Sequence, residues 1–147
     1  YTMSQVEDFL TNDEEQRIVE AIRAAELSTS GEIRIHLEKH TGKDVIDRAA
    51  EVFHWLKMDN TVERNGVLIY VAVEDHQFAI IGDKGINEAV HQNFWDSTRD
   101  IIVEHFKAGE FTKGLIEGIT MAGKELQHYF PWQHGDKNEL PNEISKG

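Results

Sequence analysis

The chain has 147 residues, which fits one domain of ordinary size and is too short for two domains and a linker. Hydrophobic residues make up 39% and charged residues 29%, the balance of a globular protein that builds its own core. The formal net charge is -12, from 27 acidic and 15 basic side chains, so a nucleic acid would be repelled while metal cations or basic partners are favoured. The absence of Cys excludes disulfides, thiolate nucleophiles and cysteine zinc sites.

Membrane insertion is not expected from the sequence. No apolar run approaches the roughly 20 residues that a spanning helix needs, and the N-terminus lacks the basic and apolar regions of a signal peptide. We therefore expect a cytoplasmic protein without membrane contact, and a monomer.

A capping box predicts the start of the first helix. Thr11 and Glu14 have its spacing, and apolar residues recur on one face as far as Ala25. We expect a helix over 12–26, which the polar and glycine residues of 28–31 bring to an end.

A strict alternation marks the next element. Apolar and polar residues alternate from Glu32 to Glu38, which is typical of a half-buried strand. Beyond a turn at 41–42, apolar residues recur at helical spacing over 45–56 and predict a second amphipathic helix.

The middle of the chain predicts two more strands. Residues 67–73 form a nearly continuous β-branched and apolar run, as in a central strand. Strand, helix and strand in this order imply a right-handed parallel crossover. Residues 78–81 follow a short polar turn and are expected to form a hairpin with the central strand.

The remainder is expected to be helical. Periodic apolar residues predict helices at roughly 86–92 and 95–107 and a last helix that stops at Pro131. The fold expected is a single α/β domain over 4–132, a three-layer α/β/α sandwich with a small mixed sheet. A flexible polar tail is expected at 133–147.

This topology gathers polar residues at one edge of the sheet, where two parallel strands begin and the hairpin strand ends. The residues that could hold a divalent metal there are Glu32, Asn65, Asp83, Glu88 and Asp96. Their carboxylate and amide oxygens are ligands that calcium and magnesium take. On spacing alone, ordinary turn chemistry is favoured: Asp83 would cap the next helix, Asn65 would be a turn residue and Glu32 a solvated strand position.

Two Glu-x-x-His pairs invite a second metal hypothesis. Glu51 with His54, and Glu125 with His128, have the spacing of ligand pairs in di-iron helical bundles. The β-rich middle of the chain conflicts with an all-helical bundle, so this hypothesis is disfavoured.

The other motif classes are missing or weak. The chain has no G-x-S-x-G elbow, no phosphate-binding P-loop and no EF-hand loop. Among its eight His residues, His36 and His40 lie on a strand and at a turn, where a spacing of four does not converge on one ion. Surface histidines are the favoured interpretation.

Four short segments together resemble the TPM domain, a family once described as a domain of unknown function. They are SGEI at 30–33, NGVLI at 65–69, FAIIGDKG at 78–85 and FKAGEF at 106–111. Their order and intervals match over about residues 5 to 130. The resemblance implies an α/β/α sandwich and divalent-cation binding by loops at the sheet edge, here around Asn65, Asp83 and Asp96. Similar proteins include a chloroplast protein linked to photosystem repair, for which acid phosphatase activity has been proposed, and membrane-anchored bacterial and animal proteins.

Three functional hypotheses follow. The first is a binding or regulatory module that takes calcium or magnesium at the sheet edge, with a protein partner for the ordered loops. The second is a metal-assisted acid phosphatase that uses the same carboxylates, with His76 or His36 as a proton donor or acceptor; no complete catalytic motif is present. The third is a metal-free protein-interaction domain anchored by Trp95 or Trp132.

Overall fold

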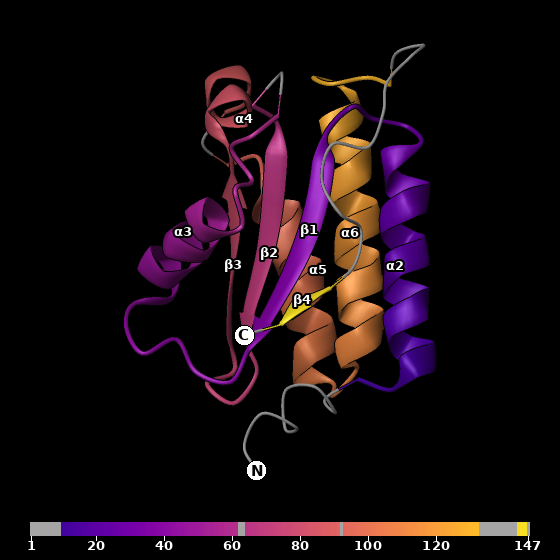
Figure 1. The fold of residues 1–147 in the computed structure, drawn as a ribbon. Coiled ribbons are helices and arrows are strands. Elements are labelled where there is room, and N and C mark those ends of the chain that lie inside the picture. Colours follow the sequence, from indigo (N-terminus) through magenta and orange to yellow (C-terminus); the bar gives the residue numbers. More distant parts are fainter. Residues whose placement is uncertain (1–9, 62–63, 92, 133–143, 147) are drawn as a thin grey trace.

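The computed structural model describes residues 10–61, 64–91, 93–132 and 144–146 (Figure 1). Helices and strands alternate in its first half, and helices predominate in its second half. In chain order the elements are α2 (Asn12–Glu26), β1 (Glu32–Glu38), α3 (Val45–Trp55), β2 (Gly66–Ala72), β3 (Gln77–Gly82), α4 (Lys84–Ala89), α5 (Asp96–Lys107), α6 (Phe111–Gln127) and β4 (Ser145–Lys146).

Helix α2 begins where the capping box predicts. The Thr11 hydroxyl accepts a hydrogen bond from the Glu14 amide at 3.1 Å, and the Glu14 carboxylate accepts one from the Thr11 amide at 2.9 Å. Two of the four amides that lack partners at a helix start are satisfied in this way. The observed bounds agree with the predicted helix.

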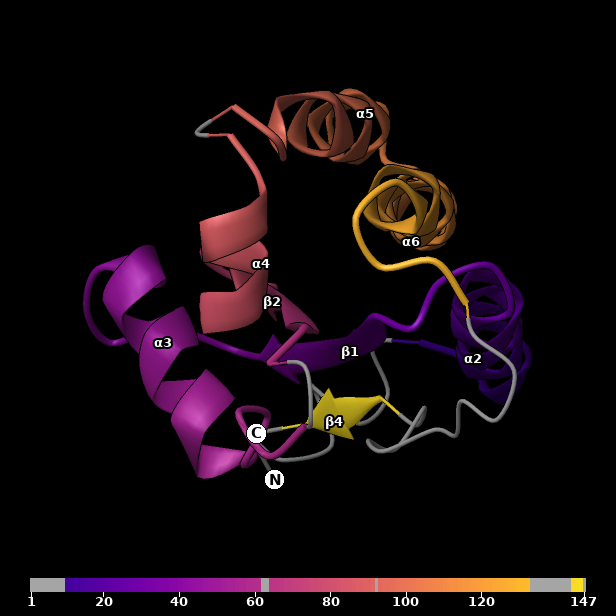
Figure 2. The same cartoon turned by 90° about the horizontal axis from the view of Figure 1, so that it is seen from above.

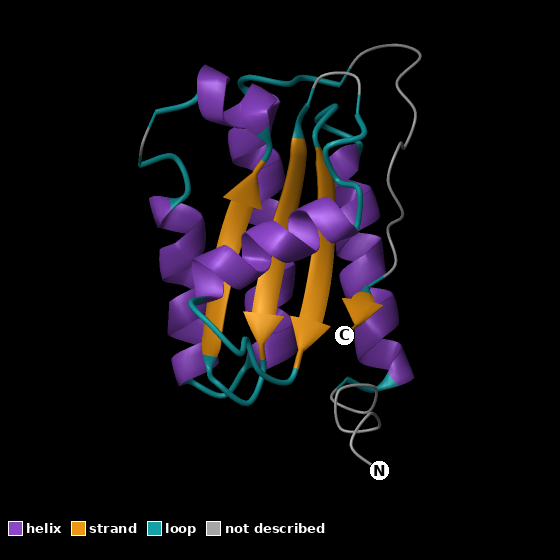
Figure 3. Cartoon of the chain, turned by 60° about the vertical axis from the view of Figure 1, so that its left-hand side comes forward, coloured by secondary structure: helices purple, strands orange, loops and turns teal. Residues whose placement is uncertain are grey.

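The four described strands form one mixed sheet in the order β3-β2-β1-β4 (Figure 3). Strands β1 and β2 are parallel, with Glu32 opposite Gly66, and β2 and β3 are antiparallel, with Val67 opposite Gly82. The parallel pair and the hairpin strand are therefore as predicted. Strand β4, which runs parallel to β1 at the sheet edge, was not predicted.

Helices cover both faces of the sheet (Figure 2). On one face, Ile33, Ile35 and Ile69 pack in a core with α2, α5 and α6. On the other face, Leu68 and Tyr70 pack against α3. This arrangement confirms the α/β/α sandwich.

Strand β1 differs from the expected half-buried strand, because both of its faces are covered. His36 is 0% exposed and Glu38 is 6% exposed, although both lie on the polar side of the alternation. Helix α3 closes over this side and supplies Arg48 to the Glu38 carboxylate. The expectation of a surface histidine is therefore wrong for His36, and hydrogen bonds rather than water satisfy its ring.

Local chemistry accounts for the other differences. Helix α4 begins at Lys84, two residues earlier than expected, because Asp83 caps its first turn. Ser145 and Lys146, expected in the flexible tail, form β4, while residues 133–143 and 147 lie outside the described part of the chain. None of the described helices is both long and apolar enough to cross a membrane.

Candidate functional site

The end of the sheet where β1 and β2 begin brings together three of the five predicted ligands. Glu32, Asn65 and Asp83 are 3%, 1% and 6% exposed. The strand registers explain their meeting, because the starts of the parallel strands and the end of the hairpin strand lie at one level. The side chains nevertheless have different partners.

Asn65 ties the start of β1 to the start of β2. Its side-chain Nδ2 donates to the Ser30 carbonyl oxygen at 3.1 Å, and its own carbonyl oxygen accepts from the Glu32 amide at 3.2 Å. Its backbone amide donates to the Thr61 hydroxyl at 3.2 Å. Asn65 therefore holds two loops in register.

Asp83 has the role that turn chemistry assigned to it. One carboxylate oxygen accepts from the Lys84 amide at 2.7 Å, and the other accepts from Arg64 Nε at 3.1 Å. The carboxylate thus caps α4 and neutralises a neighbouring guanidinium. Both of its oxygens are used within the protein.

Glu32 is not the solvated strand residue that turn chemistry suggested. Its carboxyl group lies against that of Glu26, the last residue of α2, close enough for a hydrogen bond between the two side chains. Glu26 Oε2 accepts from the Ile33 amide at 2.9 Å. Two acidic groups therefore meet beside the start of β1.

The Glu26 carboxyl group is held in its protonated form at neutral pH. Burial and the adjacent Glu32 together raise its pKa to about 8, against the opposing effect of the hydrogen bond from the Ile33 amide. Sequence reasoning missed Glu26, because its position in the helix predicted nothing special. The one available signal was an acidic residue in the last helical turn, where the helix dipole disfavours negative charge.

The remaining two predicted ligands are not drawn into this group. Glu88 is an exposed residue of α4, and Asp96 is an exposed residue at the start of α5 that pairs with Arg99 at 2.7 Å. Within the described part of the chain, no three His, Asp or Glu side chains come together in a way that could hold a metal ion. The carboxyl groups that do meet at this end of the sheet are those of Glu26 and Glu32.

A second polar cluster lies under α3 and consists of His36, Glu38, Arg48 and Tyr70. Glu38 Oε2 accepts from Arg48 Nε at 2.9 Å and also from the Tyr70 hydroxyl, and Glu38 Oε1 lies 3.3 Å from His36 Nε2. The His36 ring stacks on Tyr70 with a centroid separation of 5.8 Å. The four residues come from three elements, β1, α3 and β2.

This cluster fixes the protonation of its members. Burial alone would raise the pKa of Glu38, but hydrogen bonds from Arg48, Tyr70 and His36 outweigh it and hold the pKa at about 2. Burial lowers the pKa of His36, and burial together with Glu38 raises that of Tyr70. The cluster therefore contains a carboxylate, a neutral imidazole and a neutral phenol at pH 7.

The Glu-x-x-His pairs do not form a joint metal site. Glu51 pairs with Lys43 at 2.7 Å and with Arg48 at 3.3 Å. Helix α3, which carries this pair, and α6, which carries Glu125, pack against opposite faces of the sheet. The two pairs are therefore separated by the sheet, which agrees with the interpretation that disfavoured a di-iron bundle.

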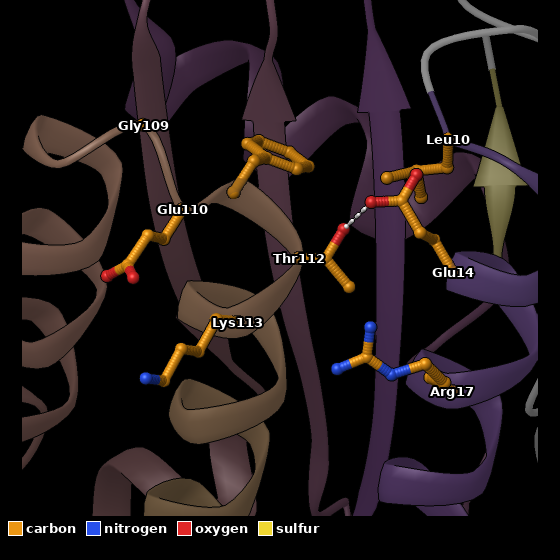
Figure 4. Close-up of a pocket in the computed structure, with 8 residues that line it drawn as sticks. Leu10, Glu14, Arg17, Gly109, Glu110, Thr112 and Lys113 are labelled. Atoms are coloured by element: carbon orange, nitrogen blue, oxygen red, sulfur yellow. Dashed lines mark hydrogen bonds between the residues drawn. The ribbon is translucent and has the colours of Figure 1, made fainter.

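A cavity of about 280 Å³ lies at the opposite end of the sheet, between the start of α2 and the connection of α5 to α6 (Figure 4). Two acidic side chains, Glu14 and Glu110, and two basic ones, Arg17 and Lys113, contribute to its lining. The Thr112 hydroxyl donates to the Glu14 carboxylate at 2.7 Å. The opposite charges are matched, and none of the predicted ligands lines this cavity.

Comparison with known proteins gives a consistent result. The family model described as the TPM domain matches residues 3–125. None of the curated proteins compared with the chain matches it. The chain is 61% identical to the BA42 protein of the psychrophilic bacterium Bizionia argentinensis, whose NMR structure it matches with a TM-score of 0.92 over 99% of this chain and 100% of that one.

Two more distant structures share the fold. The N-terminal domain of the cg2496 protein from Corynebacterium glutamicum is 12% identical, with a TM-score of 0.64 over 78% of this chain and 72% of that one. The N-terminal domain of a protein from P. gingivalis is 18% identical, with a TM-score of 0.68 over 82% of this chain and 78% of that one.

Proposed function

The chain belongs to the TPM domain family, and on that premise we propose that it binds one divalent cation, calcium or magnesium, where β1 and β2 begin. The carboxyl groups of Glu26 and Glu32 are the central ligands of this proposed site. Their contact beside the start of β1 is the observation that supports the proposal most directly.

Two carboxyl groups in contact repel each other when both are ionised, unless a positive charge lies between them. A shared proton provides this charge below a pH of about 8. A divalent cation provides more positive charge, and carboxylate and carbonyl oxygens are its preferred ligands. The loops before β1 and β2, which Asn65 holds together, bring backbone carbonyl groups to the same end of the sheet.

The charge of the site predicts weak binding. Only two carboxyl groups meet. The Asp83 carboxylate already binds Arg64 and the first amide of α4, so we do not include it among the ligands. Sites with few charged ligands bind calcium with dissociation constants of about 0.1–1 mM. We expect an affinity in this range.

The test is a titration of the isotope-labelled protein with calcium chloride and with magnesium chloride, followed by backbone amide NMR. Amides of 30–33 and 64–66 should shift with saturable curves. Glu26→Gln and Glu32→Gln should each weaken binding about tenfold or more, because each removes one charged ligand. The matched controls Glu88→Gln and Asp96→Asn remove one exposed carboxylate each and should leave the affinity unchanged.

Absence of saturable shifts at millimolar metal would contradict the proposal. Equal weakening by the control variants would contradict the assignment of the ligands, because it would show an effect of net charge only. A metal-assisted phosphatase would use the same pair of carboxyl groups to hold its metal ion. The phosphatase hypothesis and the hypothesis of a metal-free interaction domain both stay predictions.

A further inference from the structure

The outer edge of β1, away from β2, has a specific pattern of backbone hydrogen bonds. The Glu32 amide donates to the Asn65 carbonyl oxygen on the β2 side, whereas the Ile33 amide donates to the Glu26 carboxyl group. Amides of a strand point alternately to its two sides, so those of Ile35 and Leu37 also face away from β2. An open strand edge of this kind binds other extended chains.

Strand β4 covers this edge beyond Glu26. It lies beside β1 on the side away from β2 (Figure 2), with Ser145 opposite His36 and Lys146 opposite Leu37. The edge is therefore closed at its start by the Glu26 carboxyl group and at its end by a strand from the far end of the described chain.

Three successive side chains anchor this strand in three different environments. Ile144 packs against the apolar core that α2 and the sheet share. The Ser145 hydroxyl lies 2.9 Å from His36 Nδ1, and the Lys146 ammonium pairs with the Glu15 carboxylate of α2. The alternation of a strand explains why Ile144 and Lys146 point toward α2 while Ser145 points to the other face.

The contact with His36 requires a hydrogen-bond donor at position 145. The ionised Glu38 carboxylate only accepts, so the neutral His36 ring donates to it through Nε2 and must accept through Nδ1. The Ser145 hydroxyl supplies this donor. Because His36 is fully buried, loss of the hydroxyl would leave its Nδ1 without that bond.

We propose that the outer edge of β1 is a docking site for an extended apolar-Ser-Lys segment. The chain's own residues 144–146 occupy it in this structure, and the same residues of a second copy occupy it once the local strand is released. The second copy is the partner that the contacts favour, because its identical side chains reproduce the contacts with the core, His36 and Glu15. This inference is independent of the proposed cation site.

The test uses the full chain with Ile144→Asp and Lys146→Glu, substitutions that remove two anchors, and a synthetic peptide of residues 142–147. The peptide should bind this release variant and shift the Ile35 and Leu37 amides and the His36 ring signals. The unmodified chain should bind the peptide with an affinity at least about ten times weaker, because its own strand competes at a high effective concentration. Equal binding by both chains, or none by the release variant, overturns the docking site.

Peptide variants test the chemistry at position 145. A peptide with Ser145→Ala should bind about ten times more weakly, whereas Ser145→Thr, which keeps the hydroxyl donor, should restore binding. Equal affinity of the Ala and Ser peptides overturns the role of His36. If the release variant fails to fold, Lys146→Glu alone, which changes one ion pair, takes its place with the same peptides.

The role of a second copy is tested by mixing whole chains. The labelled release variant is combined with an unlabelled Glu15→Lys chain, in which the ion pair between positions 15 and 146 is broken. The same amides should shift as with the peptide, and a dimer should appear in size-exclusion chromatography. Binding of the peptide without any dimer overturns the second copy as the partner.

Discussion

Arg48 and Glu38 form a two-pronged ion pair beneath α3: Arg48 Nε lies 2.9 Å from one carboxylate oxygen, and a terminal guanidinium nitrogen bonds the other. The Glu38 side chain is 8% exposed and that of Arg48 is 33% exposed. The pair thus lets a carboxylate remain charged inside the protein, where it orders His36 and Tyr70. Removal of one partner of such a buried ion pair strongly destabilises a protein, because the other charge is left buried without compensation.

We predict that Arg48→Met lowers the free energy of unfolding by about 3 kcal/mol, because it leaves the Glu38 carboxylate buried without its cation. The matched control is Lys43→Met, which removes one of the two cationic partners of the half-exposed Glu51 and should cost less than about 1 kcal/mol. Urea unfolding at pH 7 measures both values. Similar losses in the two variants would show that burial does not determine the energy of the Arg48 pair.

Acid should destabilise the protein through Glu38. Its pKa is about 2 in the folded state against an ordinary value of 4.5, so its stabilising effect is fully present above pH 4.5 and is lost as the pH falls toward 2. We expect a loss of about 3 kcal/mol over this interval, measured as the unfolding free energy at a series of pH values. In Glu38→Gln the unfolding free energy should depend less on pH below 4.5. An unchanged pH dependence would show that another group causes the loss of stability.

The sequence predicts the fold closely because its elements carry local signals. The capping box at Thr11, the alternation from Glu32 to Glu38 and the β-branched run after Gly66 each determine an element without distant partners. Strand order then places Glu32, Asn65 and Asp83 at one end of the sheet, in agreement with the sequence-based prediction.

The buried polar clusters could not be predicted in the same way. His36 shares its face of the strand with the polar residues Arg34 and Glu38. Its burial depends on residues of other elements, among them Ser145, which is 109 positions away in the chain. No periodicity within one element carries that information. Glu26 was missed for the same reason: its partner, Glu32, belongs to the following strand.

A rise in pH from 4.5 to 8 should destabilise the protein through Glu26. Burial and the neighbouring Glu32 raise its pKa in the folded state to about 8 from an ordinary value of 4.5. Its favourable contribution is therefore complete below pH 4.5 and is lost as the pH rises through 8. The unfolding free energy should decline over this interval, less steeply in Glu26→Gln.

Calcium should oppose this decline in stability if it binds between the two carboxyl groups, because it would replace the proton that is lost. The measurement is the unfolding free energy at pH 8 with and without millimolar calcium, in the unmodified chain and in Glu26→Gln. Stabilisation of both chains to the same extent would place the calcium elsewhere.

The close approach of α2 and α6 depends on Gly123. A Cβ atom at this position would lie 2.8 Å from Ala25 Cβ and 3.3 Å from Ala25 Cα, so the backbones themselves would have to separate. We predict that Gly123→Ala lowers the free energy of unfolding by about 2 kcal/mol, although alanine favours an isolated helix by about 1 kcal/mol.

The double variant Ala25→Gly/Gly123→Ala tests this explanation, because it removes one methyl group where it adds another. It should regain most of the stability lost in Gly123→Ala, since residues in direct contact have non-additive effects. The control is Ala25→Gly/Gly118→Ala: a Cβ at Gly118 would lie 2.6 Å from Ile102 Cδ1 on α5, so shortening Ala25 gives it no room. Recovery in the control as well would show that Ala25→Gly acts on α2 itself and not on its contact with α6.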